Sequence, residues 1–165
     1  MVEITEFCPI FAKQLPDTHT LLAEAGLRVH DAVEKITLHG SRGPQGGARC
    51  DSDLDLCLVV NRRSLDAAKD RDALFREVLR TTLDGWRSKI ELDAAAVFDQ
   101  SRCGLKCLDL NEHDPDLCPG PVGCMGVFKI PEGRIAGSAV DCSRMYPLTT
   151  IWTRKENPAS QSIKR

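Results

Sequence analysis

The chain has 165 residues, enough for one domain with a hydrophobic core but too few for two ordinary domains. Hydrophobic residues make up 42% and charged residues 28% of the sequence, a composition that excludes a largely disordered protein. With 22 basic and 24 acidic side chains the net charge is -2, so nucleic-acid binding would require a local basic patch.

The N-terminal segment and the cysteines indicate the cellular compartment of the protein. Acidic residues stand near the N-terminus where a secretory signal carries Lys or Arg, and no long apolar run follows. Eight cysteines is a high count, but the chain lacks the short, loop-dominated character of a disulfide scaffold. We therefore expect a cytoplasmic protein with reduced thiols and no membrane segment.

The first predicted element is a helix over residues 17–35. Its apolar residues recur at mixed three- and four-residue spacings, as an amphipathic helix requires, and Asp17 or Thr18 can serve as its N-cap. Gly26 would permit a break in this helix, because glycine costs roughly 1 kcal/mol against alanine in a helix interior.

Two strands are predicted around a glycine-dense loop. Ile36–His39 predicts a short strand, and the loop over residues 40–47 cannot easily continue it. Residues 53–60 alternate at first and then become fully apolar, which suits a strand that is buried at one end and exposed at the other. The acidic end of this second strand is expected to face a cleft.

The second half of the chain predicts one more helix, one more strand and a different C-terminal region. Residues 64–86 predict an amphipathic helix interrupted near Asp70–Asp72, and residues 89–98 predict a third strand. Residues 126–140 predict a hairpin, and the last dozen residues are expected to fray. The expected fold is α/β (α+β): a short mixed β-sheet with helices packed on one face over residues 1–100, plus a β-rich extension over 101–165.

The acidic end of the second strand predicts a metal site. Asp53 and Asp55 are two residues apart, so both carboxylates fall on the same face of a strand. Two carboxylates about 4 Å apart repel by about 4 kcal/mol at an effective dielectric of about 20, a cost that a cation or a proton must offset. Mg²⁺ or Mn²⁺ suits this pair, because Mg²⁺ prefers a few carboxylates, water and substrate phosphates. The alternative is a solvated strand end.

The turn before that strand predicts a phosphate site. Gly40 permits close backbone approach, and the Ser41 hydroxyl with nearby amides can hold a phosphate. Arg42 and Arg49 lie in the same loop and can neutralise phosphate oxygens, or they are ordinary surface charges. His39 is expected to be a strand-end histidine rather than a catalytic base.

These residues carry a family resemblance. The stretch HGSRGPQGGARCDSDLDLCLVV, residues 39–60, is similar to the signature of the DNA polymerase β-like nucleotidyltransferase superfamily: a hydrophobic residue, Gly-Ser, a variable loop, then alternating Asp and hydrophobic residues. The loop and the DSDLDL run particularly resemble the minimal nucleotidyltransferases, which include antitoxin partners of HEPN-type RNase toxins. The resemblance implies a nucleotide site at Gly40, Ser41, Arg42 and Arg49.

The resemblance also implies a third carboxylate on a neighbouring strand, for which we choose Asp93. Glu91 remains the competing assignment, because strand alternation puts it on the same face. In the implied mechanism Asp53 and Asp55 hold the metals. Asp93 binds one of them and helps to deprotonate an acceptor hydroxyl, which attacks the α-phosphorus in line while pyrophosphate leaves.

The implied function is transfer of a nucleoside monophosphate, with ATP as the expected donor, to a hydroxyl on a protein or a small molecule. Larger relatives carry further helical domains for which this chain has no room. The acceptor surface would therefore come from residues 100–165, from a HEPN-type toxin or from an oligomer. The alternatives are a non-catalytic nucleotide-binding or interaction module on the same fold, and an RNA 3′-end nucleotidyltransferase, with RNA the less expected partner.

The C-terminal cysteines raise the question of zinc. Structural zinc sites usually pair their ligands across two to four residues twice, whereas here only one cysteine pair is so spaced. We therefore expect free thiols and leave the role of this region open. The residues concerned are Cys103, Cys107, Cys118 and Cys124, with His113 between them.

Overall fold

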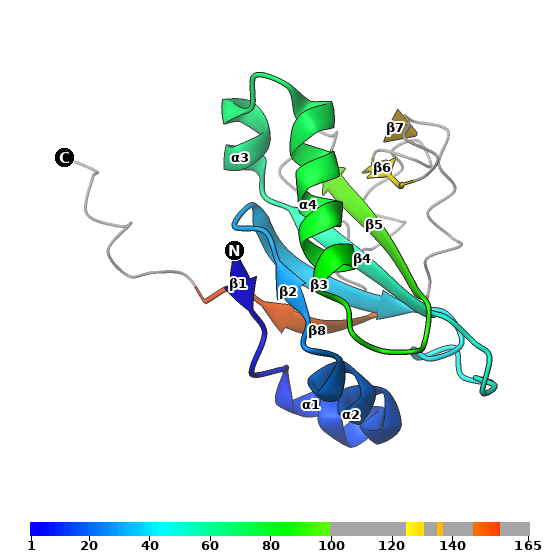
Figure 1. Ribbon diagram of the computed structural model, residues 1–165. Helices are drawn as coiled ribbons and strands as arrows, with labels where there is room; N and C mark the ends of the chain where they lie inside the picture. The colour runs from blue at the N-terminus through cyan, green and yellow to red at the C-terminus, as the bar shows by residue number, and fades with distance from the viewer. Residues whose placement is uncertain (100–124, 131–134, 137–146, 156–165) are drawn as a thin grey trace, which may run out of the picture.

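A six-stranded mixed sheet runs through the computed structural model, which describes residues 1–99, 125–130, 135–136 and 147–155 (Figure 1). Neighbours β4 and β5 are parallel, and every other neighbouring pair is antiparallel. The mixed sheet expected from the sequence is confirmed. The strands, in spatial order, are β7 (Ile135–Ala136), β6 (Met125–Phe128), β5 (Leu92–Asp99), β4 (Leu54–Val60), β3 (Val33–His39) and β8 (Thr149–Thr153).

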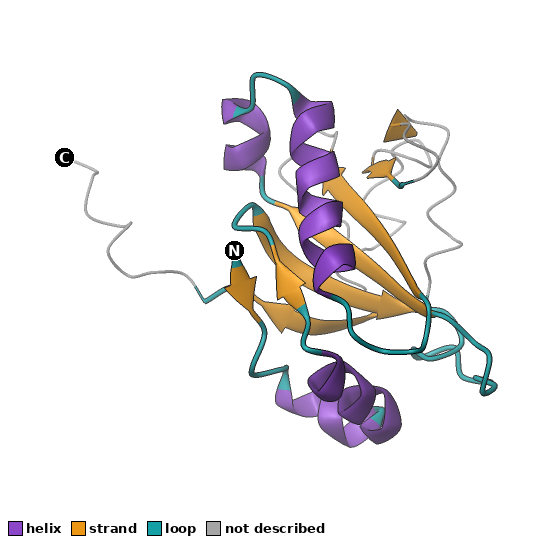
Figure 2. Ribbon diagram, viewed as in Figure 1, coloured by secondary structure: helices purple, strands orange, loops and turns teal. Residues whose placement is uncertain are grey.

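Helices accompany this sheet, and α4 lies across one of its faces (Figure 2). The two helices α3 and α4 form the crossover between the parallel strands β4 and β5, a connection that parallel pairing requires. None of the described helices is long and apolar enough to cross a membrane. The described helices are α1 (Pro9–Gln14), α2 (Pro16–Ala25), α3 (Arg62–Ala67) and α4 (Arg71–Gly85), and a small sheet pairs β1 (Val2–Glu3) with β2 (Arg28–Val29).

The hydrophobic core lies between the sheet and α4. Alternation along β4 sends every second side chain to this face, where it is fully buried. The ring of Phe75 on α4 stacks on that of Phe98 on β5, with centroids 4.4 Å apart. Because these side chains point into the core, the residues between them point to the opposite face of the sheet, where the acidic residues lie. The β4 residues that enter the core are Leu54, Leu56, Leu58 and Val60.

The break in the second predicted helix is confirmed. The Asp70 side chain accepts a hydrogen bond of 3.0 Å from the Ala73 amide, which caps α4 and separates it from α3. The side chain of Asn61 caps α3 in the same way by accepting a bond from the Ser64 amide. Asx side chains compete for backbone amides in this way, and so favour helix starts over helix interiors.

The helix predicted over residues 17–35 is wrong in its second half. Gly26 has φ 71°, a left-handed conformation that ends α2, and the chain then enters β2 and β3. The apolar residues beyond Gly26 include the β-branched Val29 and Val33, which suit strands. The predicted N-cap is wrong as well: α2 begins at Pro16 without a side-chain cap, and the Thr18 hydroxyl donates to the Arg42 carbonyl.

The described strands of the C-terminal region join both edges of the sheet. β6 pairs with β5 and with β7, which agrees with the predicted hairpin, although the turn predicted at residues 131–133 lies outside the described residues. β8 pairs with β3 and was not predicted. The four C-terminal cysteines and His113 also lie outside the described residues.

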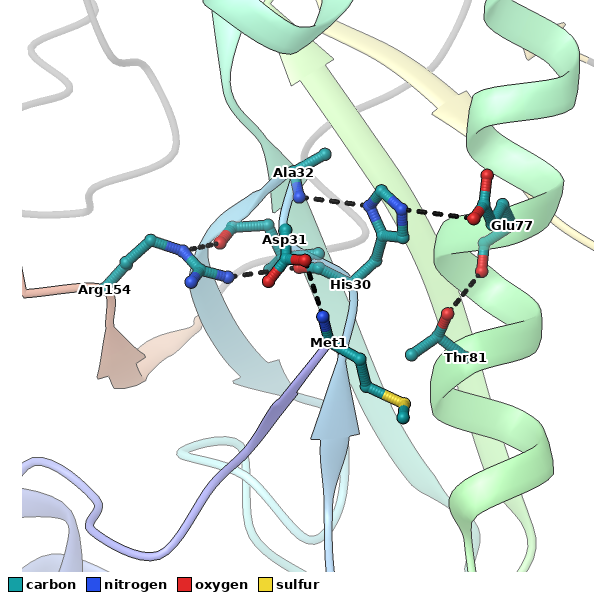
Figure 3. Close-up of polar contacts among 8 residues, drawn as sticks. Met1, His30, Asp31, Ala32, Glu77, Thr81 and Arg154 are labelled. Carbon is teal, nitrogen blue, oxygen red and sulfur yellow. Dashed lines mark hydrogen bonds and ion pairs between the residues drawn. The ribbon is translucent and has the colours of Figure 1, made fainter.

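Hydrogen bonds and ion pairs around the turn before β3 tie β8 and the N-terminus to the sheet (Figure 3). The Arg154 guanidinium donates to the carbonyls of Val33 and His30, at 2.9 and 3.2 Å. The Met1 ammonium lies 2.6 Å from a carboxylate oxygen of Asp31. These contacts gather at the end of β3 that is remote from His39, so they support the sheet without entering the acidic site.

Candidate metal and nucleotide site

Three carboxylates converge at the edge of the sheet where the parallel strands β4 and β5 begin. Asp55 and Asp93 lie opposite each other in the β4–β5 register, and Asp53 immediately precedes β4. Each residue offers one carboxylate oxygen, and these three atoms lie within 4.8 Å of one another. Asp53 is exposed and the other two are half-buried, so the cluster opens to solvent.

The local sequence explains why these side chains share a face. Leu54 is fully buried in the core, so Asp53 and Asp55 on either side of it point away from the core. Asp93 follows the buried Leu92 in the same way on β5. Glu91, the competing assignment, is exposed and precedes β5, and it is not part of the cluster.

Gly40 brings the predicted phosphate turn directly against the acidic cluster. Its φ is 70°, and a Cβ placed on it would overlap the Asp55 carboxylate, lying 2.8 Å from Cγ. The preceding residue, His39, lies opposite Asp55 in the β3–β4 register. Glycine is therefore required at position 40 for both its backbone conformation and the close approach. Ser41 is half-buried, and its hydroxyl makes no hydrogen bond within the described part of the chain.

The two arginines predicted to bind phosphate differ in position. The Arg42 guanidinium donates to the carbonyls of Ser52, Arg49 and Cys50 at 2.7, 3.1 and 3.4 Å, and so ties the two ends of the loop together. The Arg49 side chain is 80% exposed and lies 3.3 Å from the Asp51 carboxylate. Arg42 thus has a loop-holding position, whereas Arg49 is free to turn toward a ligand from the surface.

The pKa of Asp55 reflects its position in the cluster. Its pKa is raised to about 6, first by burial and then by repulsion from Asp53 and Asp93, against the opposing effect of Lys129. Burial and two neighbouring carboxylates both favour the protonated form of Asp55, a cost that a bound cation would offset.

Lys129 is a member of the site that sequence reasoning missed. It directly follows β6, and its ammonium lies 2.9 and 2.7 Å from the two carboxylate oxygens of Asp93. The predicted hairpin included this residue, but the sequence contains no signal that β6 would pair with β5 and bring Lys129 to Asp93.

His39 lies beside the cluster as an uncharged neighbour. Burial lowers its pKa first and Lys129 lowers it further, while Asp93 and Asp53 oppose the shift. Its Nδ1 lies 3.7 Å from the thiol of Cys57, whose pKa burial raises to about 12. At neutral pH the pair adds neither an imidazolium nor a thiolate, so Lys129 supplies the positive charge that approaches the cluster within the described residues.

The donor set fits a hard divalent cation. Carboxylate oxygens, partial exposure and uncompensated negative charge match the preferences of Mg²⁺ and Mn²⁺, whereas zinc sites favour nitrogen and sulfur ligands. Asp53, Asp55 and Asp93 can therefore hold a metal ion. Comparison of the chain with protein-family models, with curated proteins and with solved structures found no match.

Proposed function

We propose that the chain is a Mg²⁺- or Mn²⁺-dependent nucleotidyltransferase of the DNA polymerase β-like superfamily. It would move a nucleoside monophosphate, with ATP as the donor, to a hydroxyl on a protein or small molecule. The observation that carries the proposal is the convergence of three carboxylates within 4.8 Å, directly beside the Gly40 turn. A carboxylate cluster that can hold a cation, beside a turn with available backbone and hydroxyl donors, suits the positioning and charge stabilisation that phosphoryl-type transfer requires.

In this proposal Asp53, Asp55 and Asp93 would hold the metal, which would supply Lewis acidity and balance charge on the phosphates. Phosphate oxygens are bound by the Gly40 and Ser41 amides and by the Ser41 hydroxyl, which has no hydrogen-bond partner among the described residues; these contacts orient the α-phosphorus. Asp93 accepts the proton of the acceptor hydroxyl. A bond then forms between that oxygen and the α-phosphorus, and the bond to pyrophosphate breaks.

The acceptor surface is proposed to involve a partner. The three carboxylates and the turn account for the chemistry of the nucleotide donor, and the acceptor requires a further surface. A HEPN-type toxin, a second copy of the chain or residues 100–165 would supply that surface. A protein hydroxyl on such a partner is the acceptor class that the resemblance to minimal nucleotidyltransferases favours.

A non-catalytic nucleotide-binding module is the second candidate. The observation that favours it is the ion pair between Lys129 and Asp93, which occupies the carboxylate that would take the proton. Such a module would bind ATP through the Gly40 turn without turnover.

Incubation of the chain with Mg²⁺, α-labelled ATP and candidate acceptors distinguishes the two. The enzyme predicts pyrophosphate release and labelled acceptor, both abolished in Asp53→Asn/Asp55→Asn. Asp51→Asn is the matched control, because Asp51 lies in the same loop but outside the cluster. Release that persists in the double variant would overturn the proposal, and tight ATP binding without release for any acceptor would favour the module.

A further inference from the structure

The ion pair between Lys129 and Asp93 is more buried than an ordinary surface ion pair. Both side chains are only about one-third exposed, 36% and 38%, and the ammonium contacts both oxygens of the same carboxylate. No other described residue donates to Asp93. Its carboxylate, unlike those of Asp53 and Asp55, is therefore already occupied by a cation from the protein.

The three carboxylates differ in whether a cationic side chain contacts them. Asp53 and Asp55 have no described cationic partner, whereas Asp93 has Lys129 at hydrogen-bond distance. A divalent cation that uses all three carboxylates needs the same oxygen atoms that Lys129 holds. Lysine and cation cannot both contact those oxygens closely, because two positive charges at such separations repel by several kcal/mol at the effective dielectric of a protein surface.

We propose that Lys129 is a built-in competitor for the metal site, holding the Asp93 carboxylate until a divalent cation displaces it and thereby setting the cation affinity of the cluster. The proposal rests on the proposed function only in requiring that the cluster binds a divalent cation. It adds a regulatory element that neither the acidic motif nor the family resemblance contains. Low metal concentration leaves Asp93 bound to Lys129, and high concentration frees it for the third ligand position.

The position of Lys129 supports this role. Lys129 directly follows β6, and β5–β6 pairing holds its backbone beside the strand that carries Asp93. A displaced ammonium would thus remain close and return when the cation leaves.

Titration of metal-free protein with Mn²⁺, without nucleotide, tests the proposal by calorimetry. Lys129→Met removes the charge at similar side-chain length, and we expect its Kd for Mn²⁺ to fall about tenfold, equivalent to about 1.4 kcal/mol. Lys129→Arg keeps the charge and should bind as the wild type does. Lys155→Met is the matched control, because Lys155 pairs with the Glu6 carboxylate at 3.2 Å, and neither residue belongs to the acidic cluster.

The Asp93→Asn background separates competition from a general charge effect. Loss of a distant positive charge would tighten Mn²⁺ binding equally in both backgrounds, whereas competition for Asp93 requires most of the Lys129→Met gain to vanish in Asp93→Asn/Lys129→Met. The wild type gives a second measurement: nitrogen NMR of the lysine ammonium groups during Mg²⁺ addition should shift the Lys129 signal and leave that of Lys155 unchanged.

The outcomes are distinct. An unchanged or weaker affinity in Lys129→Met, an equal gain in both backgrounds, or a Lys129 signal that stays fixed at saturating Mg²⁺ would overturn the competition. Only this inference fails if the wild type binds Mn²⁺, the Asp53→Asn/Asp55→Asn variant does not, and the Lys129→Met variant has the same Kd as the wild type. If no form of the protein binds Mn²⁺, the metal-dependent function fails with it.

Discussion

Gly40 lies so close to Asp55 that no side chain fits between them: a Cβ at position 40 would overlap the Asp55 carboxylate. The Gly40 turn and the acidic cluster are thus in direct contact, and the geometry of one depends on the other. A change at Gly40 should therefore affect metal binding although the residue itself offers no ligand.

Gly40→Ala is expected to lower stability and divalent-cation affinity together. The positive φ alone costs of order 1–3 kcal/mol for a residue other than glycine. The added Cβ must also displace the Asp55 carboxylate, so we expect Mn²⁺ affinity to fall by about tenfold or more, equivalent to about 1.4 kcal/mol. Urea unfolding measures the first effect and Mn²⁺ titration the second.

Gly46→Ala is the matched control for this experiment. Gly46 has nearly the same φ, 72°, but a Cβ there meets nothing within 4 Å. The Gly46→Ala variant should be less stable than the wild type because of the backbone conformation at position 46, but it should bind Mn²⁺ with the same affinity. Equal Mn²⁺ affinities in the two variants would show that contact with Asp55 is unimportant for the site.

The sequence is sufficient to predict the local part of this site. Period-two alternation around the buried Leu54 placed Asp53 and Asp55 on one face, and Gly40 next to a strand end indicated a turn of special conformation. Both signals depend on residues close in the chain, where strand geometry leaves few alternatives.

The remaining parts depend on pairing between distant segments. Lys129 reaches Asp93 only because β6 pairs with β5, and Thr150 lies opposite Thr37 only because β8 closes the other edge of the sheet. Neither partnership has a local pattern to indicate it. The helix predicted through Gly26 failed for a related reason: the same apolar spacing serves a helix or a strand, and the left-handed glycine and the strand partners decided between them.

Asp55→Asn is expected to stabilise the metal-free protein at neutral pH. The pKa of Asp55 is raised from 3.8 to about 6 in the folded state, so its ionisation disfavours folding. Stability from this group is complete below the unfolded pKa, falls as pH rises from 3.8 toward 6, and stays low above that. Solvent screening limits the gain to about 1 kcal/mol, equivalent to about 2–4 °C in Tm for a chain of this size.

Thermal unfolding in chelator at pH 5 and pH 8 measures this prediction. The variant should exceed the wild type at pH 8, and the difference should shrink at pH 5, where Asp55 is largely protonated. Asp51→Asn provides the comparison, because its carboxylate is 70% exposed and lies outside the cluster. A difference that is the same at both pH values would contradict the raised pKa.

Divalent cations should raise the Tm of the wild type. A cation that binds only the folded state, at a free concentration of about 100 times its Kd, adds about 2.7 kcal/mol to the free energy of unfolding. The increase should be larger at pH 8 than at pH 5, because a proton on Asp55 competes with the metal below its pKa of about 6. Asp53→Asn/Asp55→Asn should show no increase. Equal increases in this variant and in the wild type would place the binding site elsewhere.

Arg42→Met and Arg49→Met should separate a loop-holding arginine from a ligand-binding one. Arg42 donates to three loop carbonyls, and hydrogen bonds from charged groups contribute about 1.5–3 kcal/mol each. Its loss should lower stability by about 2 kcal/mol and weaken Mn²⁺ binding indirectly by loosening the loop before Asp53. Arg49 is 80% exposed, so its loss should leave the free energy of unfolding within about 0.5 kcal/mol of the wild type.

ATP binding in the presence of Mg²⁺ then assigns the phosphate contact. If Arg49 turns from Asp51 toward a phosphate, Arg49→Met weakens ATP binding about tenfold, equivalent to about 1.4 kcal/mol, with Tm unchanged. Arg49→Lys should recover only part of this loss, because a point charge replaces a forked donor. Unchanged ATP affinity in Arg49→Met would leave Ser41 and the turn amides as the phosphate-binding groups, since the Arg42 guanidinium is already committed to the carbonyls of its own loop.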